Sequence, residues 1–471
     1  MSSVPRFPIP VTVEAAAPRR AQGRAARVER AGVLLRPWLP WIHALMFVSF
    51  LALLLGPVAL PEDHLASQLG GLGNWLIWGI WFPLVFVSVL FSGRSWCGVL
   101  CPMGAASEWV NRVGLKRSVP SWLRWEGTPV VSFVLITILG QTVGVRDYPE
   151  ALLEVFGGTL VAALAIGFLY GRNKRAWCRH ACPIGLLLGV FSRLGIVQFT
   201  PKHKKPGGDA YTTKGMCPTM IDIPRKEESR HCIECFRCVH PDRKGGLMVR
   251  LRHPGEEIEA IREHHPNATE VAFLFLGTGV SLGGFLWLVL PSYQAWRQAV
   301  GEWAIDHGAY WIGQPGPWWL MSVHPAQREV FNWLDFSMIV GYMSGWMLAV
   351  AAVLSVTTVL ATAAAGRLGA SGGFRQRFVE LGYQYAPVAM VSLILGLASE
   401  LFAGLSRLEP GLAAVVKVSL LAGSLLWSLY LGNRILARQG LDGARRWPAL
   451  VPGAAGTLAV AAAWWPVIFG V

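Results

Sequence analysis

The residues best able to do chemistry are four cysteines in the middle of the chain. Three of them follow the spacing Cys-x2-Cys-x2-Cys at Cys232, Cys235 and Cys238, and the fourth, Cys217, stands upstream and directly before a proline. Three thiolates from such a run and one from a remote Cys-Pro form a ligand set that binds one [4Fe–4S] cluster. A Cys-x2-Cys pair alone would also suit zinc or a redox dithiol. The third cysteine and the remote Cys-Pro favour the [4Fe–4S] cluster over zinc.

The other four cysteines lie in a repeated motif. Trp-Cys-x3-Cys-Pro occurs with its cysteines at Cys97 and Cys101 and again at Cys178 and Cys182. Cysteines at i and i+4 share one face of a helical turn, and the proline suits the first turn of the next helix. Both copies follow the second helix of an apolar hairpin, so they are parallel repeats, which an axis along the membrane normal relates. The repeat predicts that the two motifs meet near this axis.

The eight cysteines of the chain divide evenly between these two patterns. Eight thiolates can hold two [4Fe–4S] clusters with no cysteine left over. We therefore predict one cluster on the Cys-x2-Cys-x2-Cys motif and a second at the repeat axis. A redox-active dithiol pair, or thiols that only pack the helix ends, are the alternatives for the repeated cysteines.

The composition is that of a membrane protein. Of the 471 residues 53% are hydrophobic, the mean hydropathy is +0.43, and several apolar runs approach or exceed the ~20 residues that cross a bilayer as a helix. The net charge of +14 first indicates basic loops near anionic lipid. Basic and aromatic residues do not interleave as they do in single-strand-binding proteins, so we expect no nucleic-acid partner.

Nine membrane spans are expected, and the basic residues orient them. The spans run over about 38–60, 74–92, 129–145, 151–170, 271–290, 336–361, 381–404, 411–432 and 448–470. With the N-terminus inside, nearly every loop rich in Lys and Arg falls on the cytoplasmic side, as the positive-inside rule requires. All eight cysteines then lie on the cytoplasmic side, where thiols stay reduced and metal ligation is their better use.

The two cysteine patterns between and after membrane spans resemble the membrane polyferredoxin family. That family includes the accessory ferredoxin of periplasmic nitrate reductase, the nitrous oxide reductase regulator and the cytochrome oxidase assembly ferredoxin. The resemblance covers roughly residues 38–245. It implies electron transfer through [4Fe–4S] clusters in the bacterial cytoplasmic (inner) membrane, in support of a periplasmic metalloenzyme or metal-uptake system.

The sequence departs from the family pattern in two places. The first ferredoxin cysteine run is reduced to Cys217, and the last cysteine of the second run is missing after Cys238, so the segment should hold one cluster rather than two. Five further spans follow, an architecture that looks closest to the ferredoxin subunit of bacterial ferrous-iron uptake systems. Its partners there would be a periplasmic redox protein or permease subunit and a cytoplasmic electron donor or acceptor.

The expected fold is an all-α polytopic membrane protein of about nine transmembrane helices with a small cytoplasmic ferredoxin-like iron–sulfur segment. Residues 1–36 are expected as a disordered basic cytoplasmic tail. A four-helix core of two parallel repeats fills 37–197, and the ferredoxin-like segment fills 198–266. The C-terminal membrane domain, 267–471, has about five helices and a Trp-rich periplasmic segment at 291–333.

One pair of ionisable residues stands out within the predicted spans. Glu400 and Lys417 fall at similar depth, and ionisable groups in a membrane are costly and tend to mark function. A proton or quinone site is the functional interpretation, and a structural ion pair is the simpler one. Both cluster sites are expected on one side of the ~30 Å bilayer core, so an electron from a periplasmic donor needs another carrier to reach them. A quinone would serve as that carrier.

Three functions remain open at this point. The first is an electron-transfer subunit of an oxidoreductase system, rather than a stand-alone enzyme, that serves periplasmic ferrous-iron oxidation and permeation or a metalloenzyme. The second is an assembly or regulatory factor whose clusters sense the redox or metal state. The third is an ion permease with a structural iron–sulfur module.

Overall fold

The structure, a computed structural model, describes the chain except for residues 1–18, 60–70, 209, 242–243, 326–327 and 470–471. In this described part, eight helices are long and apolar enough to cross a membrane. They run over Gly23–Ala59, Gly71–Ser92, Pro149–Leu169, Ala268–Val289, Trp333–Arg367, Phe374–Leu397, Leu412–Arg438 and Gly443–Phe469. The described strands form only two two-stranded sheets. The expected all-α polytopic membrane fold is therefore confirmed.

The segment expected as the third span is a shorter helix. It forms α7, Thr128–Thr142, whose 15 residues at 1.5 Å per residue reach about 22 Å, less than the ~30 Å hydrocarbon core. α7 packs against α11, Pro183–Ser192, and against α13, Ala268–Val289. Neighbouring helices of the protein therefore line much of this short helix.

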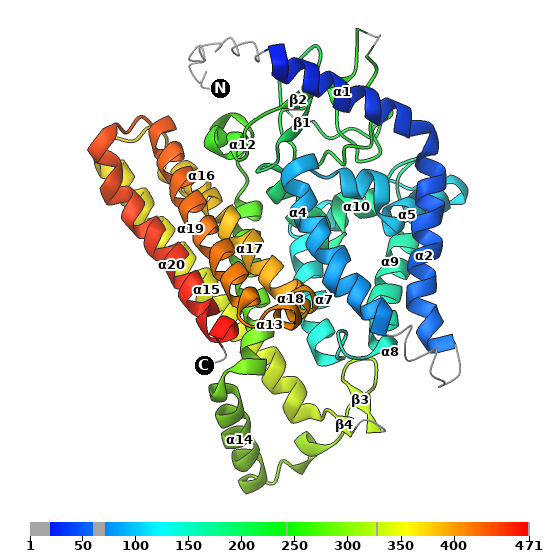
Figure 1. The fold of residues 1–471 in the computed structure, drawn as a ribbon, viewed down its shortest axis with the longest axis vertical. Coiled ribbons are helices and arrows are strands. Elements are labelled where there is room, and N and C mark those ends of the chain that lie inside the picture. Colours follow the sequence, from blue (N-terminus) through cyan, green and yellow to red (C-terminus); the bar gives the residue numbers. More distant parts are fainter. Residues whose placement is uncertain (1–18, 60–70, 209, 242–243, 326–327, 470–471) are drawn as a thin grey trace.

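The two repeats pack across one another (Figure 1). In the first, α4, Phe82–Ser92, leads through the cysteine turn into α5, Pro102–Val113. In the second, α9, Gly158–Leu169, leads through the turn of α10, Ala176–His180, into α11. α5 packs on α9, and α11 packs on α4. Because each repeat sends the helix after its turn onto the hairpin of the other, the two turns are brought together.

A small sheet lies at the same end of the molecule as the cysteine turns (Figure 1). β1, Val197–Pro201, pairs antiparallel with β2, Leu247–Leu251. These strands bracket the segment that carries the Cys-x2-Cys-x2-Cys motif. Their pairing brings the two ends of this segment together, so the motif is held as a compact unit against the repeats.

The N-terminal region differs from the expected disordered tail. Residues Arg19–Leu35 form helix α1, which lies along β2, and the other part of that prediction, residues 1–18, falls outside the described residues. Ala25 is buried, Glu29 accepts a hydrogen bond from the Val249 amide at 3.2 Å, and Gly32 faces the Phe236 ring. The basic composition of this stretch gave no sign of the helix, because its few apolar contacts are made with a sheet far along the chain.

A buried ion network joins the second repeat to the rest of the molecule. The fully buried Arg193 guanidinium lies 2.8 Å from Glu228, 2.9 Å from Glu257 and 2.9 Å from Glu270. Glu228 and Glu257 lie between β1 and α13, and Glu270 lies in the first turn of α13. The corresponding arginine of the first repeat, Arg112, is exposed. Among the described residues, this arginine position therefore ties the second repeat, and not the first, to the C-terminal domain.

The C-terminal domain is built around a close pair of helices. α13 packs along α15, Trp333–Arg367, and glycines permit the approach. A Cβ on Gly279 would lie 2.7 Å from the Met347 Cα, and one on Gly283 would lie 3.0 Å from the Met343 Cα. The remaining long helices complete the domain. They are α17, Ala386–Leu397, α19, Leu412–Arg438, and α20, Trp447–Phe469.

The Trp-rich segment lies at the end of the molecule opposite the small sheet (Figure 1). It forms α14, Pro291–Asp306, and the short hairpin of β3, Val323–His324, with β4, Glu329–Val330. Trp296 and Trp303 on α14 are exposed. The Trp-rich segment and the small sheet therefore lie at opposite ends of the molecule.

Candidate metal centres

Both Cys-x3-Cys-Pro turns end at the start of a helix. Cys101 is the residue before α5 and Cys182 the residue before α11, so each proline occupies the first helical position, as predicted. The amides of Met103 and Gly104 donate to the Cys101 sulfur, and burial raises the pKa of this thiol to about 11. Amide groups at a helix N-terminus suit a negatively charged sulfur, which is the form that binds iron.

The four repeated cysteines line one cavity of about 90 Å³. Cys97 and Cys101 come from one repeat, and Cys178 and Cys182 come from the other. The repeats approach closely there, because a Cβ on Gly104 would lie 3.2 Å from the Cys178 sulfur. The structure thus brings these four predicted site residues together, in the arrangement expected of parallel repeats.

Two buried arginines stand beside this cavity. Arg94 lies with its Nη2 4.0 Å from the Cys97 sulfur, and its Nη1 donates to the Arg230 carbonyl at 2.5 Å. Arg175 donates to the Cys97 carbonyl at 2.9 Å. Their positive charges would offset the negative charge that thiolates bring into a buried site.

The other four predicted ligands, Cys217, Cys232, Cys235 and Cys238, line a second cavity. The second repeat holds the remote Cys-Pro in place through the two residues just before its turn. The Arg175 amide donates to the Pro218 carbonyl at 2.8 Å, and the Lys174 ammonium donates to the Cys217 carbonyl at 2.9 Å. The two cysteine sets are thus positioned by shared elements.

The two sets also touch directly through the backbone. A Cβ on Gly98, in the first repeat's turn, would lie 2.9 Å from the Cys235 nitrogen and 3.0 Å from its Cα. His43, a lone histidine of the first span, hydrogen-bonds through Nε2 to the Gly98 carbonyl at 3.1 Å. The backbone of one set therefore adjoins the backbone of the other with no side chain between them at this point.

Replacing Gly98 by alanine should disturb this contact. The added methyl group meets backbone atoms that cannot rotate away, and overpacking of this kind typically costs about 1–3 kcal/mol. We expect a lower thermal unfolding midpoint in detergent and less bound iron. The control is Gly158→Ala, where a Cβ meets nothing within 4 Å and alanine suits a helix better than glycine. Equal midpoints for the two variants would contradict the close approach.

Glu108 connects the three parts of the site. Its carboxylate accepts from Arg175 at 2.7 Å and from both terminal nitrogens of Arg237, at 2.6 and 2.9 Å. Glu108 belongs to the first repeat, Arg175 precedes the second turn, and Arg237 lies between two cysteines of the Cys-x2-Cys-x2-Cys motif. Although burial alone would raise the pKa of Glu108, the charges of Arg175 and Arg237 lower it to about 2. The carboxylate therefore stays ionised and clamps the three parts together.

The donor sets fit iron–sulfur clusters. Each of the two cavities is lined by four thiols, amide donors face a sulfur of the first set, and arginines lie nearby. In the described residues, no three or more His, Cys, Asp or Glu side chains gather closely enough to hold a single metal ion. Four thiols spread around a cavity are the donors that a multi-iron cluster requires.

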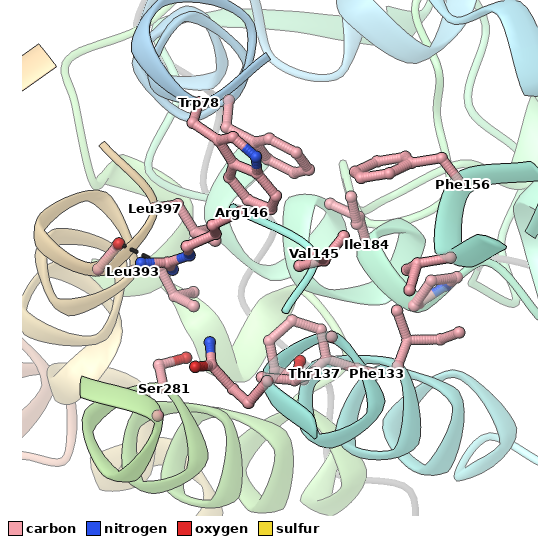
Figure 2. A pocket seen from close by; sticks show the side chains of 18 of the residues that line it. Trp78, Phe133, Thr137, Val145, Arg146, Phe156, Ile184, Ser281, Leu393 and Leu397 are labelled. Carbon is pink, nitrogen blue, oxygen red and sulfur yellow. Dashed lines mark hydrogen bonds between the residues drawn. The ribbon is translucent and has the colours of Figure 1, made fainter. Parts of the chain in front are cut away.

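An apolar cavity of about 140 Å³ adjoins the cavity of the repeated cysteines. Cys182, Met103 and Ile184 line both. Figure 2 shows aromatic rings around this apolar space and the Arg146 guanidinium at its side. Arg146 donates to the Gly396 carbonyl at 3.1 Å, and its Nε is buried without a hydrogen-bond partner in the described part of the chain.

The structure does not bring Glu400 and Lys417 together. No ion pair joins them among the described residues, and the Lys417 ammonium lies 5.1 Å from the centre of the Phe402 ring. The span predicted at 381–404 ends early, because α17 stops at Leu397 and α18, Ser399–Leu408, begins after a break at Ala398. The break directs Glu400 toward Arg146, with which it interacts electrostatically.

Comparison with known proteins identifies the repeats. A family model described as "4Fe-4S binding domain" matches twice, at residues 74–120 and 155–201, and each match contains one Cys-x3-Cys-Pro turn. These matches support a likeness of the chain to the membrane polyferredoxin family. They also support a membrane iron–sulfur protein that transfers electrons through [4Fe–4S] chemistry.

The relatives of this chain include ferredoxin-type and regulatory proteins. The ferredoxin-type protein NapH of Haemophilus influenzae is 25% identical over 222 residues, 42% of this chain and 75% of NapH. The regulatory protein NosR of Stutzerimonas stutzeri is 24% identical over 194 residues, 34% of this chain and 26% of NosR. Protein NirI of Paracoccus denitrificans is 27% identical over 184 residues, 35% of this chain and 27% of NirI. No solved structure matches the chain.

Arg94 and Arg175 are site residues that the sequence reasoning missed. Each stands three residues before the first cysteine of its repeat, so the full motif reads Arg-x-Trp-Cys-x3-Cys-Pro. This shared position was the available signal. Glu108 had no such signal, because the second repeat has Gly189 at the equivalent position.

Proposed function

We propose that this chain relays single electrons through two [4Fe–4S] clusters, one in each cavity lined by four cysteines. The observation that carries the proposal is the division of all eight cysteines into two sets whose backbones touch at Gly98 and Cys235. Such contact suits transfer from one centre to the next. A bound cluster would supply one-electron redox chemistry, at a potential set by nearby charge and hydrogen bonds.

The residues of the chain have distinct parts in this proposal. Cys97, Cys101, Cys178 and Cys182 would hold one cluster, and Cys217, Cys232, Cys235 and Cys238 would hold the other. The amides at the start of α5 and the buried arginines stabilise thiolate charge. Glu108 fixes the distance between the sets by holding the arginines of both.

The proposal extends to the side of the membrane. The basic loops favour a cytoplasmic location for both cysteine sets in the inner membrane, with the Trp-rich end in the periplasm. Partners would then be a cytoplasmic electron donor or acceptor and a periplasmic redox protein or permease subunit, in a metalloenzyme or ferrous-iron system. The name of the relative NosR, a regulatory protein, favours redox-linked regulation as the second candidate function.

A membrane quinone is the carrier that the structure favours. The apolar cavity next to Cys182 has aromatic and aliphatic walls, which suit a quinone ring and its isoprenoid chain. Arg146 brings a charged donor to this otherwise apolar space, and no residue in the described part of the chain accepts from its Nε. Such a donor would bind and orient a quinone carbonyl.

Replacing Arg146 by glutamine should slow electron exchange with a short-chain quinol. A hydrogen bond to a charged group is worth about 1.5–3 kcal/mol, so the rate at low quinol concentration should fall roughly 10- to 100-fold. The measurement is stopped-flow absorbance of cluster reduction. Arg112→Gln, at an exposed arginine, is the control. An unchanged rate in Arg146→Gln would refute the assignment of this cavity to a quinone.

Iron and acid-labile sulfide per chain, with electron paramagnetic resonance after dithionite reduction, test the main proposal. About eight irons and two reducible signals are expected from two cubanes. About four irons would leave one cysteine set as thiols and favour dithiol chemistry or assembly. Zinc in place of iron would overturn the electron-transfer proposal.

A further inference from the structure

A fourth cavity is polar, is lined by residues from the neighbourhood of both cysteine sets, and has no part in the proposed electron transfer. Its volume is about 280 Å³. The charged and imidazole side chains that line it are Arg124, Arg179, Arg230, His180, His231 and Glu126. Three arginines thus face one glutamate, so the lining is predominantly cationic.

The cavity offers donors as well as charge. His180 is buried, and its Nε2 has no hydrogen-bond partner within the described part of the chain. Arg230 is already paired with Glu270 at 2.9 Å and with Glu126 at 3.2 Å, so it is held firmly in place. Arg124 is exposed at the rim. A cationic hollow with a buried polar atom that lacks a partner is built to accept an anion with several oxygen acceptors.

The surroundings indicate that this anion is part of a membrane lipid. Trp122 and Trp125 flank Arg124 and are 64% and 61% exposed. They stand just before α7, where this apolar helix begins. Exposed tryptophans are typical of the membrane–water interface, and basic pockets between membrane helices bind phosphate headgroups.

We propose that this cavity binds a phosphate group, supplied by an anionic phospholipid headgroup. The cavity reaches both cysteine sets through the chain, because His180 lies between Cys178 and Cys182 and His231 directly precedes Cys232. A bound negative charge there would lower the reduction potentials of both centres, a consequence that rests on the proposed function. The binding itself does not depend on that function.

Lipid retention tests the proposal on the full chain. The protein would be exchanged into nanodiscs of phosphatidylcholine with or without phosphatidylglycerol, then extracted in mild detergent and weighed by native mass spectrometry. We expect retained phosphatidylglycerol in the wild type and roughly tenfold less in Arg124→Gln, since one charged hydrogen bond is worth about 1.5 kcal/mol or more. Arg112→Gln, an exposed arginine outside the cavity, should retain as much as the wild type.

The controls separate the sources of phosphate and the two proposals. Retention of phosphatidylglycerol that resists added inorganic phosphate supports the lipid headgroup, whereas displacement by inorganic phosphate would identify a free anion as the ligand and overturn the lipid source. Equal retention in the Arg124→Gln and Arg112→Gln variants, or no preference over phosphatidylcholine, would overturn the site. Iron content measured on the same samples reports on the clusters separately, so a failure of either proposal can be recognised.

Discussion

Replacing Cys178 by serine should remove about four of the eight expected irons and one of the two redox signals. Cys178 and its three companions line one cavity, and none of them lines the other. A cubane that loses one of four thiolates is destabilised, while the second set keeps all of its ligands. Iron analysis and electron paramagnetic resonance on the purified variant measure both quantities.

The matched variant is Cys235→Ser in the other set. It should remove a similar amount of iron but the other signal, and the double variant should retain little iron. The assignment of four cysteines to each centre would be wrong if both single variants abolished the same signal. It would also be wrong if Cys178→Ser left the iron content at the wild-type value.

Replacing Glu108 by glutamine should weaken the whole assembly of the two sites. The change leaves the buried Arg175 without its carboxylate partner and removes the two-pronged contact with Arg237. Breaking a buried pair by removing one partner typically costs about 3–5 kcal/mol, because a charge is left uncompensated. We expect a clearly lower unfolding midpoint in detergent, and a weaker magnetic interaction between the two reduced centres.

Glu256→Gln is the control for this prediction. Glu256 pairs with Arg250 at 2.8 Å, but both side chains are partly exposed, at 27% and 30%. Pairs of this kind contribute at most about 1 kcal/mol. If Glu108→Gln were no more destabilising than Glu256→Gln, the three-part clamp would have little energetic importance.

The cysteine turns could be predicted from the sequence because their geometry is local. Local features constrain this part of the chain: the i and i+4 spacing, the proline at the helix start and the parallel repeat. The structure places Cys97 and Cys178 on one cavity, as expected. The ion pairs could not be predicted in this way. Glu108 meets residues 67 and 129 positions away, and nothing in its local sequence marks it as their partner.

Two further differences arise from packing rather than propensity. Helix α1 is polar and basic, and it is ordered by contacts with β2, more than 200 residues along the chain. The break at Ala398 interrupts a run that is apolar on both sides of Ser399 and Glu400, so hydropathy alone extends the span past it. Because the helix breaks there, Glu400 lies near Arg146 and does not pair with Lys417 as expected.

The close pairing of α13 with α15 limits how the C-terminal domain could move. Gly279 and Gly283 let the two backbones meet at van der Waals distance, so the methionines opposite them are used in packing. A carrier that exposes its site alternately to the two sides of a membrane needs bundles that rock past one another. In this domain, α13 and α15 would have to move together as one rigid unit. A gate would therefore have to be formed by the other helices.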